Sequence, residues 1–385
     1  MRVLYWADFF LPHIGGVETF SGDLIPALQA RGHEVTVVTS PHRPGLPSFE
    51  QVGSIPVYRF EIWDALRTSD LQKLVAVRRA VSALKRQLKP DITHLHFGAA
   101  SYMHLQTRAA ACTPTLTTVH VVPQGSLRDH SLLGSIVHAS QAVNAVSAVG
   151  YQRLCAAFPE AADRLSFVYY GLGPSAGSPI EVIPPRFGEP VLLCLGRLAP
   201  QKGFDLALRA FAQVEKAVPK ARLMIVGEGV EESALKQLAR NLGIAGKVDF
   251  TGSVPPEEVY AVINKATVML LPSRFEGLPL VALQAARMQR PIISSAVDGL
   301  PELVVDQDSG LVLGDNNESE WAEAILSLMQ DPHKAIAMGK ALAHRFEERF
   351  GFDQCVSQYE RLYRHIAEEA GGDRELSSDQ SRLGA

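Results

Sequence analysis

Short apolar runs alternate with longer segments of helical periodicity along almost the whole of this 385-residue chain. The runs are nearly continuous in hydrophobicity, as in PVLLCLGR at 190–197 and TVMLLPS at 267–273. Strands that are apolar on both faces are typical of parallel sheets covered by helices on both sides. The pattern therefore predicts an α/β fold with doubly wound parallel sheets.

The predicted strands fall into two groups. Those of the first half are 3–7, 34–40, 57–60, 91–97, 114–120, 144–149 and 165–171. Those of the second half are 190–197, 222–229, 247–253, 267–273, 290–296 and 310–314. Between the groups lies Gly171–Pro190, whose glycine and proline content is typical of a linker.

This linker divides the chain into two predicted Rossmann-like domains, at residues 1–172 and 188–350. Helical periodicity over 351–370 predicts a final helix that packs back on the first domain. The polar segment 371–385 is expected to be a disordered tail. Ligands of open parallel sheets bind outside the carboxyl ends of the strands, so we expect the site in a central cleft between the two domains.

Composition excludes several classes of protein. A net charge of −4 does not indicate a nucleic-acid partner. The scattered cysteines form no CxxC pair, which argues against a disulfide framework or a structural zinc site and suits a reducing cytosol. The first residues do not resemble a signal peptide, and no apolar run approaches the ~20 residues that span a bilayer. We expect a cytoplasmic protein whose membrane contact, if any, is peripheral.

Two cations follow the first strand of the second domain. Arg197 and Lys202 lie just before a helix that is predicted to begin near Asp205. An arginine binds phosphate oxygens through its fork, a lysine supplies a point charge, and a helix N-terminus favours anions. The arrangement predicts a diphosphate clamp. The alternative is a pair of solvated surface cations.

An acidic residue, Glu276, lies between the strand that breaks at Pro272 and the helix that Pro279 is expected to start. A carboxylate in this loop could accept hydrogen bonds from two sugar hydroxyls. Its alternative role is a helix N-terminal charge, which contributes ~0.3–1 kcal/mol through the helix dipole. Gln284 falls about two turns into the same helix.

Glycines after other strands are weaker indications. Gly15 and Gly16 precede a helix and could bring backbone N–H groups close to an anion, or form a plain tight turn. The Gly227–Gly229 stretch does not have the third glycine of a dinucleotide fingerprint, which disfavours a nicotinamide dehydrogenase. Small residues at Gly252 and Ser253 leave room for a flat base.

Three histidines lie near strand ends. We expect His94 to be structural, His96 to lie near the cleft, and His120 to be the site histidine, since a loop follows it directly. His94 and His96 form an H-x-H pair without an evident third metal ligand. Asp306 and Asp308 form a D-x-D triplet, but the following Ser-Gly indicates a surface turn, so no metal is expected.

Taken together, these segments resemble the retaining glycosyltransferases of the GT-B fold, specifically glycosyltransferase family 4. The resemblance covers nearly the whole chain and is strongest over 191–313, in LCLGRLAPQKGFDLALRAF, LMIVGEG, LLPSRFEGLPLVALQAA and DGLPELVVDQDSGLVL. The N-terminal LPHIGGVETF and RGHEVTVVTS are also similar to this family.

The resemblance implies a hexosyltransferase-type enzyme with a nucleotide-sugar donor bound mainly by the second domain, an acceptor bound by the first, and no metal or other cofactor. It assigns catalytic roles to His120, Glu276, Arg197 and Lys202. The implied donor-binding residues are Gly15, Gly16, Arg197, Lys202, Gly229, Gly252, Ser253, Glu276, Gly277, Leu278, Pro279, Leu280 and Gln284.

Gln284 is the main departure from the family pattern, because it replaces the second acid of the E-x7-E motif. An amide keeps a carbonyl acceptor but loses the charge, which costs roughly 1 kcal/mol per hydrogen bond. Two alternatives to a transferase therefore stay open: a donor-binding module with weak or no activity, and, ranked lower, a GT-B epimerase. A smaller departure is Tyr170-Gly171, where the family often has Asn-Gly.

The acceptor is expected to be a glycan, a lipid-linked molecule or a small molecule, as in polysaccharide biosynthesis. The segment 71–89 has apolar residues at helical spacing with basic residues among them. It is interpreted first as an amphipathic surface helix with a solvated cationic face. The alternative is peripheral contact with an anionic membrane at the inner face.

Overall fold

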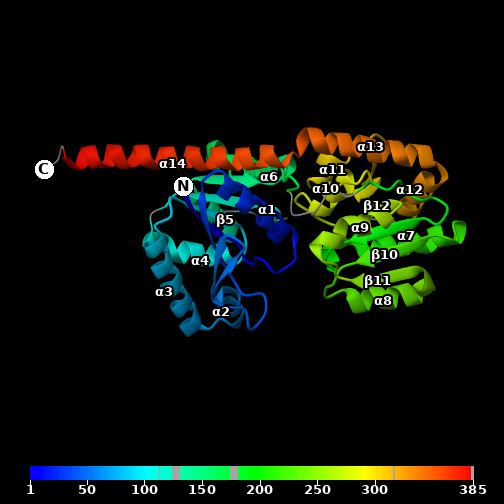
Figure 1. Cartoon of the computed structure of the whole chain (residues 1–385), viewed down its shortest axis with the longest axis horizontal. Coiled ribbons are helices and arrows are strands. Elements are labelled where there is room, and N and C mark those ends of the chain that lie inside the picture. The colour runs from blue at the N-terminus through cyan, green and yellow to red at the C-terminus, as the bar shows by residue number, and fades with distance from the viewer. Residues whose placement is uncertain (112, 124–130, 174–180, 315–316, 383–385) are drawn as a thin grey trace. The chain divides into compact units, whose positions relative to one another are not determined.

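The computed structural model describes residues 1–111, 113–123, 131–173, 181–314 and 317–382, with side chains as far as 370. The chain divides into two compact units (Figure 1). Unit 1 comprises Met1–Val168 and the segment from Asp353 onward, and unit 2 comprises Tyr169–Phe352. Each unit contains one sheet with helices around it, so the predicted doubly wound α/β architecture is confirmed.

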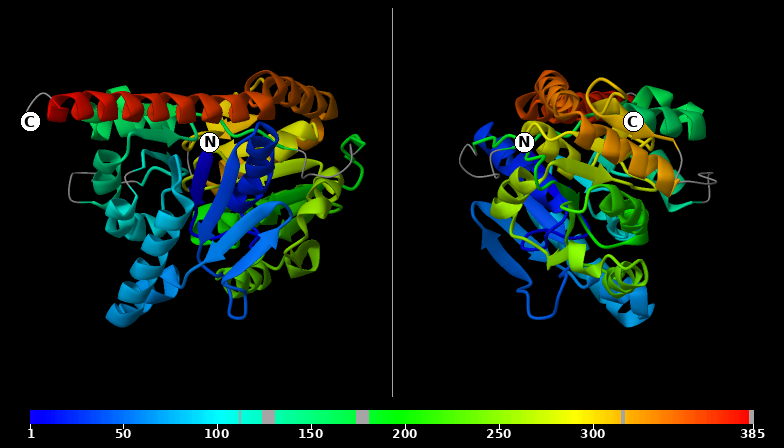
Figure 2. Two further views of the ribbon diagram at one scale, coloured as in Figure 1. Left: turned by 60° about the vertical axis from the view of Figure 1, so that its left-hand side comes forward. Right: turned by 90° about the vertical axis from the view of Figure 1, so that its right-hand side faces the viewer.

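The sheet of unit 1 has the strand order β3-β4-β2-β1-β5-β6-β7-β8. Its strands are β1 (Arg2–Trp6), β2 (Glu34–Thr39), β3 (Phe49–Val52), β4 (Ile55–Arg59), β5 (Ile92–His96), β6 (Thr115–Val119), β7 (Ala142–Ala145) and β8 (Leu165–Phe167). All the pairs are parallel except the β3–β4 hairpin at one edge (Figure 2). The central strands β5 and β6 are buried at every position, as continuous apolar runs predict.

Three details of unit 1 differ from the sequence prediction, the first being that the strand expected at 165–171 ends at Phe167. Strand β3 was not predicted, because Phe49–Val52 is an exposed edge strand with a mixed sequence rather than an apolar run. The strand predicted at 144–149 instead ends at Ala145. Ser147 ends it by starting a helix, since its hydroxyl accepts a hydrogen bond from the Gly150 amide at 3.1 Å.

The helices of unit 1 that connect these strands pack on the two faces of the sheet. They are α1 (Gly16–Ala30), α2 (Ile62–Thr68), α3 (Leu71–Leu88), α4 (Ala100–Thr107), α5 (Leu132–Ala139) and α6 (Ala148–Ala157), with short turns at Arg108–Ala110 and Pro159–Arg164. Helix α3 begins where it does because the Asp70 carboxylate caps the amides of Gln72 and Lys73. None of the described helices is both long and apolar enough to cross a bilayer.

The last helix, α14 (Phe352–Arg382), packs on unit 1, as predicted (Figure 1). Its buried Tyr363 hydroxyl lies 2.7 Å from Nδ1 of His94, and its Tyr359 hydroxyl accepts a hydrogen bond from Asn144 at 3.2 Å. Helix also continues through 371–382, where a disordered tail was expected. No proline interrupts that segment, so the backbone ladder can extend. Residues 383–385 lie outside the described residues.

The sheet of unit 2 is parallel throughout, with the order β11-β10-β9-β12-β13-β14. Its strands are β9 (Val191–Leu195), β10 (Arg222–Val226), β11 (Val248–Gly252), β12 (Val268–Leu271), β13 (Ile292–Ser295) and β14 (Leu311–Leu313). Its helices are α7 (Phe204–Ala217), α8 (Glu232–Asn241), α9 (Val259–Lys265), α10 (Leu280–Arg287), α11 (Leu300–Leu303), α12 (Glu318–Gln330) and α13 (Pro332–Arg349).

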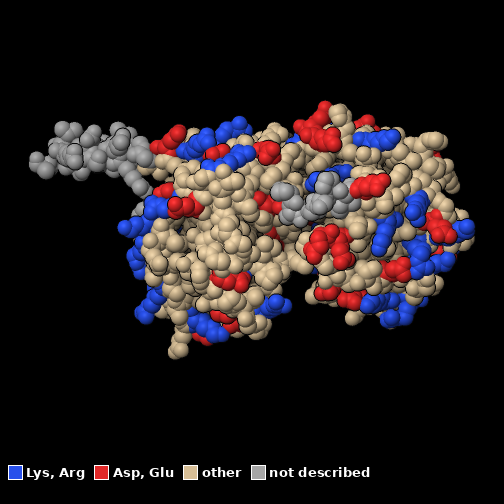
Figure 3. Space-filling view, in the orientation of Figure 1, with Lys and Arg blue, Asp and Glu red and all other residues tan. Residues whose placement is uncertain are grey.

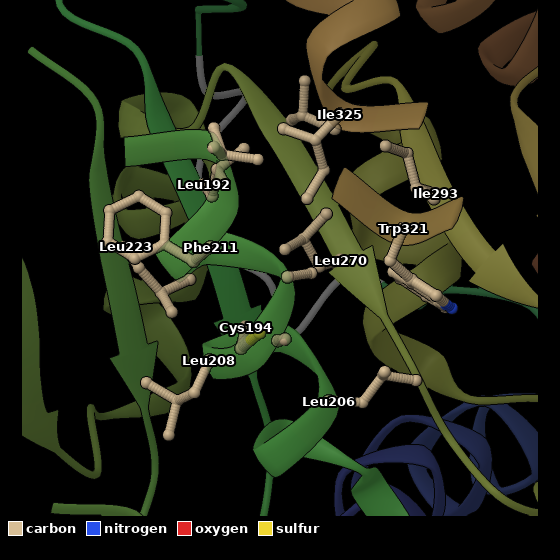
Figure 4. Packing of buried hydrophobic residues seen from close by; sticks show 14 of the residues in the cluster. Leu192, Cys194, Leu206, Leu208, Phe211, Leu223, Leu270, Ile293, Trp321 and Ile325 are labelled. Atoms are coloured by element: carbon tan, nitrogen blue, oxygen red, sulfur yellow. The ribbon is translucent and has the colours of Figure 1, made fainter. Parts of the chain in front are cut away.

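One face of this sheet packs against α7 and α12. Phe211 of α7 and Trp321 and Ile325 of α12 pack with Leu192 and Leu270 of the sheet (Figure 4). All five side chains are fully buried. This packing fixes β9 and β12 side by side, and the loops that follow these two strands therefore start from neighbouring points at the carboxyl edge.

Lys85 of α3 is a buried cation in unit 1. Its ammonium lies 5.0 Å from the centroid of the Trp6 ring and 3.5 Å from Nδ1 of His104. Burial, reinforced by the nearby charge of Arg108, lowers the pKa of Lys85 to about 7 from an ordinary value of 10.5. The unfolded chain therefore binds more protons than the folded one between pH 7 and pH 10.5.

The contribution of Lys85 to the free energy of unfolding should therefore rise with pH across this window. Below pH 7 Lys85 is charged in both the folded and the unfolded chain, so the cost of burying its charge should be constant there. We expect Lys85→Met to be more stable than the wild type at pH 6 by about 1–3 kcal/mol, and this gain to shrink as the pH approaches 10. Urea denaturation at several pH values measures both effects. Lys73→Met is the matched control, because Lys73 is exposed and paired with Asp64; a pH-independent gain at Lys85 would contradict the prediction.

Candidate active site

Two loops at the carboxyl edge of the unit 2 sheet are held together by hydrogen bonds. One follows β9 and the other follows β12. The Arg274 guanidinium lies 2.9 Å from an Asp205 carboxylate oxygen and also donates to the Pro200 carbonyl, while the Arg274 amide donates to the Gln201 carbonyl at 2.8 Å. The Gln201 amide group donates in return to the Phe275 carbonyl at 3.0 Å. Arg274 and Gln201 were not among the predicted site residues, although both lie close to such residues in the sequence.

Gly203 allows this close approach. It has φ of +65°, in the left-handed region, and a Cβ atom there would lie 1.9 Å from the Pro272 carbonyl oxygen. Any other residue would therefore clash with backbone as well as adopt an unfavourable conformation. The residue also forms the N-cap of α7, so the same glycine places the start of that helix against the second loop.

Lys202 and Glu276, one from each loop, form a largely buried ion pair. The Lys202 ammonium lies 2.5 Å from Oε1 of Glu276, and the Ser273 hydroxyl donates to the same oxygen at 2.8 Å. The side chains are 17% and 7% exposed, respectively. The structure thus brings together two residues that lie 74 positions apart in the sequence.

A third loop, after β13, supports Glu276 from the other side. The Glu276 amide donates to a carboxylate oxygen of the buried Asp298 at 2.5 Å, and the Gly299 amide donates to the Gly277 carbonyl at 2.9 Å. Asp298 adopts φ of +48°, which is uncommon for a residue other than glycine. Asp298 was part of the segment that resembled the family, but it was not predicted as a site residue. Its role depends on a contact that spacing does not reveal.

Arg197 is exposed in the loop after β9, beside glycines of the β10 loop. Gly227 and Gly229 have positive φ, and Cβ atoms on them would lie 1.9 Å from the Gly196 carbonyl oxygen and 2.3 Å from that of Leu198. The close backbone approach at these glycines is therefore between two loops of the protein. Arg197 owes its position to this tight packing.

The remaining donor-site candidates of unit 2 line the same edge. Gly252 ends β11, and the Ser253 hydroxyl donates to the Glu228 carboxylate at 2.8 Å. Gly277 is in the loop beside Glu276, and Pro279 is the N-cap of α10, as the sequence predicted for the helix start. Leu278 and Leu280 are buried, whereas Gln284 is half-buried in the second turn of α10.

In unit 1, Gly15 is the N-cap of α1 and Gly16 its first residue, at the carboxyl edge of the sheet. Nothing lies within 4 Å of the place that a Cβ atom on Gly16 would occupy. A Cβ atom on Gly15 would instead meet the carboxylate of Glu18. Packing therefore does not demand a glycine at position 16.

His120 follows β6 and contacts His96 at the end of β5. Its Nε2 lies 2.7 Å from Nδ1 of His96, and the two rings are stacked with an interplanar angle of 12°. Burial lowers the pKa of His120 to about 3 and that of His96 well below its usual value, so both rings are neutral near pH 7. His94 faces Tyr363 and Thr118 within the core, in the structural position predicted for it.

No group of three or more His, Cys, Asp or Glu side chains placed to hold a metal ion occurs in the described part of the chain. Asp306 and Asp308 lie in a turn, where the Asp306 carboxylate accepts a hydrogen bond from the Val312 amide at 3.0 Å.

Two doubly wound α/β units, the second with a wholly parallel sheet, have the fold of the GT-B glycosyltransferases. The profile of Glycosyltransferase Family 4 matches residues 14–175, and that of Glycosyl transferases group 1 matches residues 180–345. The chain belongs to glycosyltransferase family 4.

Similar proteins match most of its length. The GDP-mannose-dependent alpha-(1-6)-phosphatidylinositol monomannoside mannosyltransferase of Mycobacterium tuberculosis is 30% identical over 361 residues, which cover 88% of this chain and 92% of that protein. The glycogen synthase of the same species is 25% identical over 391 residues, 94% of each chain. Sucrose-phosphate synthase from Thermosynechococcus elongatus has a similar fold, with a TM-score of 0.79, 22% identity and coverage of 95% and 98%.

The loop packing at Gly203 can be tested directly. We expect Gly203→Ala to destabilise the protein by roughly 2–4 kcal/mol, because the methyl group adds a backbone clash to the conformational strain. Gly243→Ala is the control, since Gly243 has a similar φ of +75° but nothing within 4 Å of its Cβ position, and it should lose only about 1 kcal/mol. Equal losses in urea denaturation would contradict the proposed close contact.

Proposed function

We propose that this glycosyltransferase transfers a sugar from a nucleoside diphosphate to an acceptor hydroxyl with retention of anomeric configuration and without a metal ion. One observation carries the proposal: Lys202 and Glu276 are paired at 2.5 Å in a largely buried position at the start of α7. A cation here can face phosphate oxygens while the carboxylate faces sugar hydroxyls. Both groups are already desolvated, so each interacts strongly with a ligand.

Arg197 and Lys202 are proposed to bind the diphosphate. The N-terminus of α7 adds oriented backbone N–H groups, and the backbone of Gly15 and Gly16, open at Gly16, is proposed to contact a donor phosphate in the same way. Gly229, Gly252, Ser253 and the loop Gly277–Leu280 would surround the nucleoside. The Gln284 amide would accept one ribose hydrogen bond.

The chemical step breaks the bond between the anomeric carbon and the diphosphate oxygen. Positive charge develops on the sugar ring and negative charge on the leaving diphosphate, where the two cations stabilise it more strongly than in the ground state. The acceptor hydroxyl attacks the same face of the anomeric carbon. Its proton passes to an oxygen of the departing phosphate, so no separate protein base is required.

His120 is proposed to orient the sugar as a neutral group. Because burial lowers its pKa to about 3, it acts through a hydrogen bond and not as an imidazolium ion at neutral pH. Glu276 is proposed to hold other sugar hydroxyls. Asp298 and Ser273 would then act by fixing the loop and the carboxylate of Glu276.

A second candidate is a donor-binding protein with weak or no transferase activity, and Gln284 is the observation that favours it. The connected set of Lys202, Glu276, Ser273 and Asp298 favours an active enzyme, because a decayed site would have no need to keep this buried charge pair. Release of nucleotide from a donor in the presence of acceptor distinguishes the two. An epimerase would convert the donor without releasing nucleotide.

The acceptor is proposed to be a glycan, a lipid-linked molecule or a small polyol bound by unit 1. The mannosyltransferase relative is named for a phosphatidylinositol monomannoside acceptor. Helix α3 is proposed to touch an anionic membrane at the cytoplasmic face. Two apolar side chains of α3, Leu71 and Val75, are 76% and 41% exposed. Arg78 and Arg79 are exposed one turn further along the same helix. Basic side chains also line this edge of unit 1 (Figure 3), so apolar and cationic groups are available to an anionic membrane surface.

The donor clamp predicts that Arg197→Ala and Lys202→Ala each lower sugar transfer by about 100-fold, since each removes stabilisation of the leaving diphosphate. Lys236→Ala is the control, because Lys236 pairs with Glu232 on the surface of unit 2. A thermal-shift panel of GDP-mannose, UDP-, ADP- and dTDP-glucose identifies the donor first. Native rates in both site variants would end the proposal, and EDTA should leave wild-type turnover unchanged.

Membrane contact predicts that the protein sediments with vesicles containing phosphatidylglycerol and not with pure phosphatidylcholine. Leu71→Asp combined with Arg79→Glu should abolish sedimentation, because it removes an apolar contact and reverses one charge worth about 1 kcal/mol near an anionic surface. Val230→Asp is the control, as Val230 is 85% exposed in unit 2. Identical binding by the wild type and the double variant would leave α3 as a solvated surface helix.

A further inference from the structure

Four aromatic rings gather on loops at the carboxyl edge of the unit 1 sheet. Phe9 and His13 follow β1, His42 follows β2, and Trp63 lies in α2 after β4. The Phe9 ring is stacked on Trp63 with centroids 5.8 Å apart and an interplanar angle of 12°, and it lies 5.0 Å from His13. His13 in turn lies 5.2 Å from His42. The rings come from two loops and a helix that are separate in the sequence, so only the fold brings them together.

Trp63 is both exposed and held in place. The indole stacks on Phe9 and lies beside the Asp8 carboxylate, which accepts hydrogen bonds from the amides of Ala99 and Ala100 at 3.0 and 2.7 Å. Stacking therefore holds the indole in place. It is nevertheless 39% exposed, whereas Trp6 and Trp321, the other tryptophans of the chain, are fully buried.

An ordered indole that is exposed to water is an apolar surface already arranged for binding. Exposing this ring to water costs stability, and the cost is offset when a ligand covers the ring. The polar groups beside Trp63 indicate which class of ligand fits this surface. Nδ1 of His13 lies 3.1 Å from Oε1 of Glu18, a buried carboxylate in the first turn of α1. Flat apolar rings beside a carboxylate and an imidazole suit a molecule with one C–H face and an edge of hydroxyl groups.

We propose that Phe9 and Trp63 form a stacking platform for a ring of the acceptor, a pyranose or a cyclitol, and that His13 and Glu18 bind its hydroxyl groups. The C–H face of such a ring loses contact with water on the indole, while its hydroxyls keep hydrogen bonds. An acyl chain would gain nothing from the carboxylate. The proposal rests on the glycosyltransferase function and gives that function a chemical class of acceptor.

Tryptophan fluorescence tests the platform without turnover. Trp63 is the exposed tryptophan, so quenching by acrylamide reports mainly on it. Methyl α-mannopyranoside, methyl α-glucopyranoside and myo-inositol are the probes, and glycerol is the acyclic control. We expect at least one ring compound to reduce quenching in the wild type, and Phe9→Ala, which keeps the Trp63 reporter, to abolish this effect. Equal quenching with all three rings and with glycerol would overturn the proposal.

Kinetics separate the platform from the donor site. Trp63→Ala and Phe9→Ala should raise the KM for the ring acceptor about tenfold, the loss of one stacking contact, and leave nucleotide affinity unchanged. Phe167→Ala is the matched control. Phe167 is 38% exposed, and it lies on β8, the outer strand at the opposite end of the sheet from β3 and β4. An unchanged KM in both platform variants would overturn the proposal. Failure of the wild-type protein to bind any nucleotide would instead count against the proposed function.

Discussion

The ion pair between Lys202 and Glu276 is the contact around which three loops at the carboxyl edge of the unit 2 sheet are arranged. Desolvating two charges is costly, and the cost is recovered only with close geometry and further hydrogen bonds. Ser273 supplies one of these to the carboxylate, and Asp298 holds the backbone of Glu276. Gly203 is required because the two loops touch at the backbone. Three loops from three neighbouring strands thus serve one charge pair, which is the arrangement expected where a ligand carries both phosphate and hydroxyl groups.

In unit 1, the histidine proposed for the site is held neutral and oriented. His120 and His96 share a hydrogen bond across neighbouring strands, and His94 is fixed beneath them by Tyr363 of α14. The final helix therefore completes the core under these histidines. At the same sheet edge, the platform of Phe9 and Trp63 is left exposed although it is rigid. Neutral hydrogen-bonding groups and aromatic faces suit uncharged polyols, just as the cations of unit 2 suit a diphosphate.

The fold followed largely from local pattern, and the exceptions have local causes. Continuous apolar runs identified the buried strands of both sheets, because burial on both faces leaves little choice of residue. The edge strand β3 carries no such constraint, and its sequence gave no signal. The end of β7 was misplaced because the alternation of small apolar residues continues past Ser147, whereas the hydroxyl of that residue caps a helix.

For the candidate site, the sequence determined the chemical types on offer and their order: two cations and one carboxylate after particular strands, with a histidine after another. The tertiary structure decided which of them meet. The contact of Lys202 with Glu276, the support from Asp298, and the stacking of Phe9 on Trp63 all join residues from different loops. Parallel strands are connected through helices, so neighbours at a sheet edge are far apart along the chain. Periodicity and motif spacing describe local order, and only the packing of the sheet converts that order into distances.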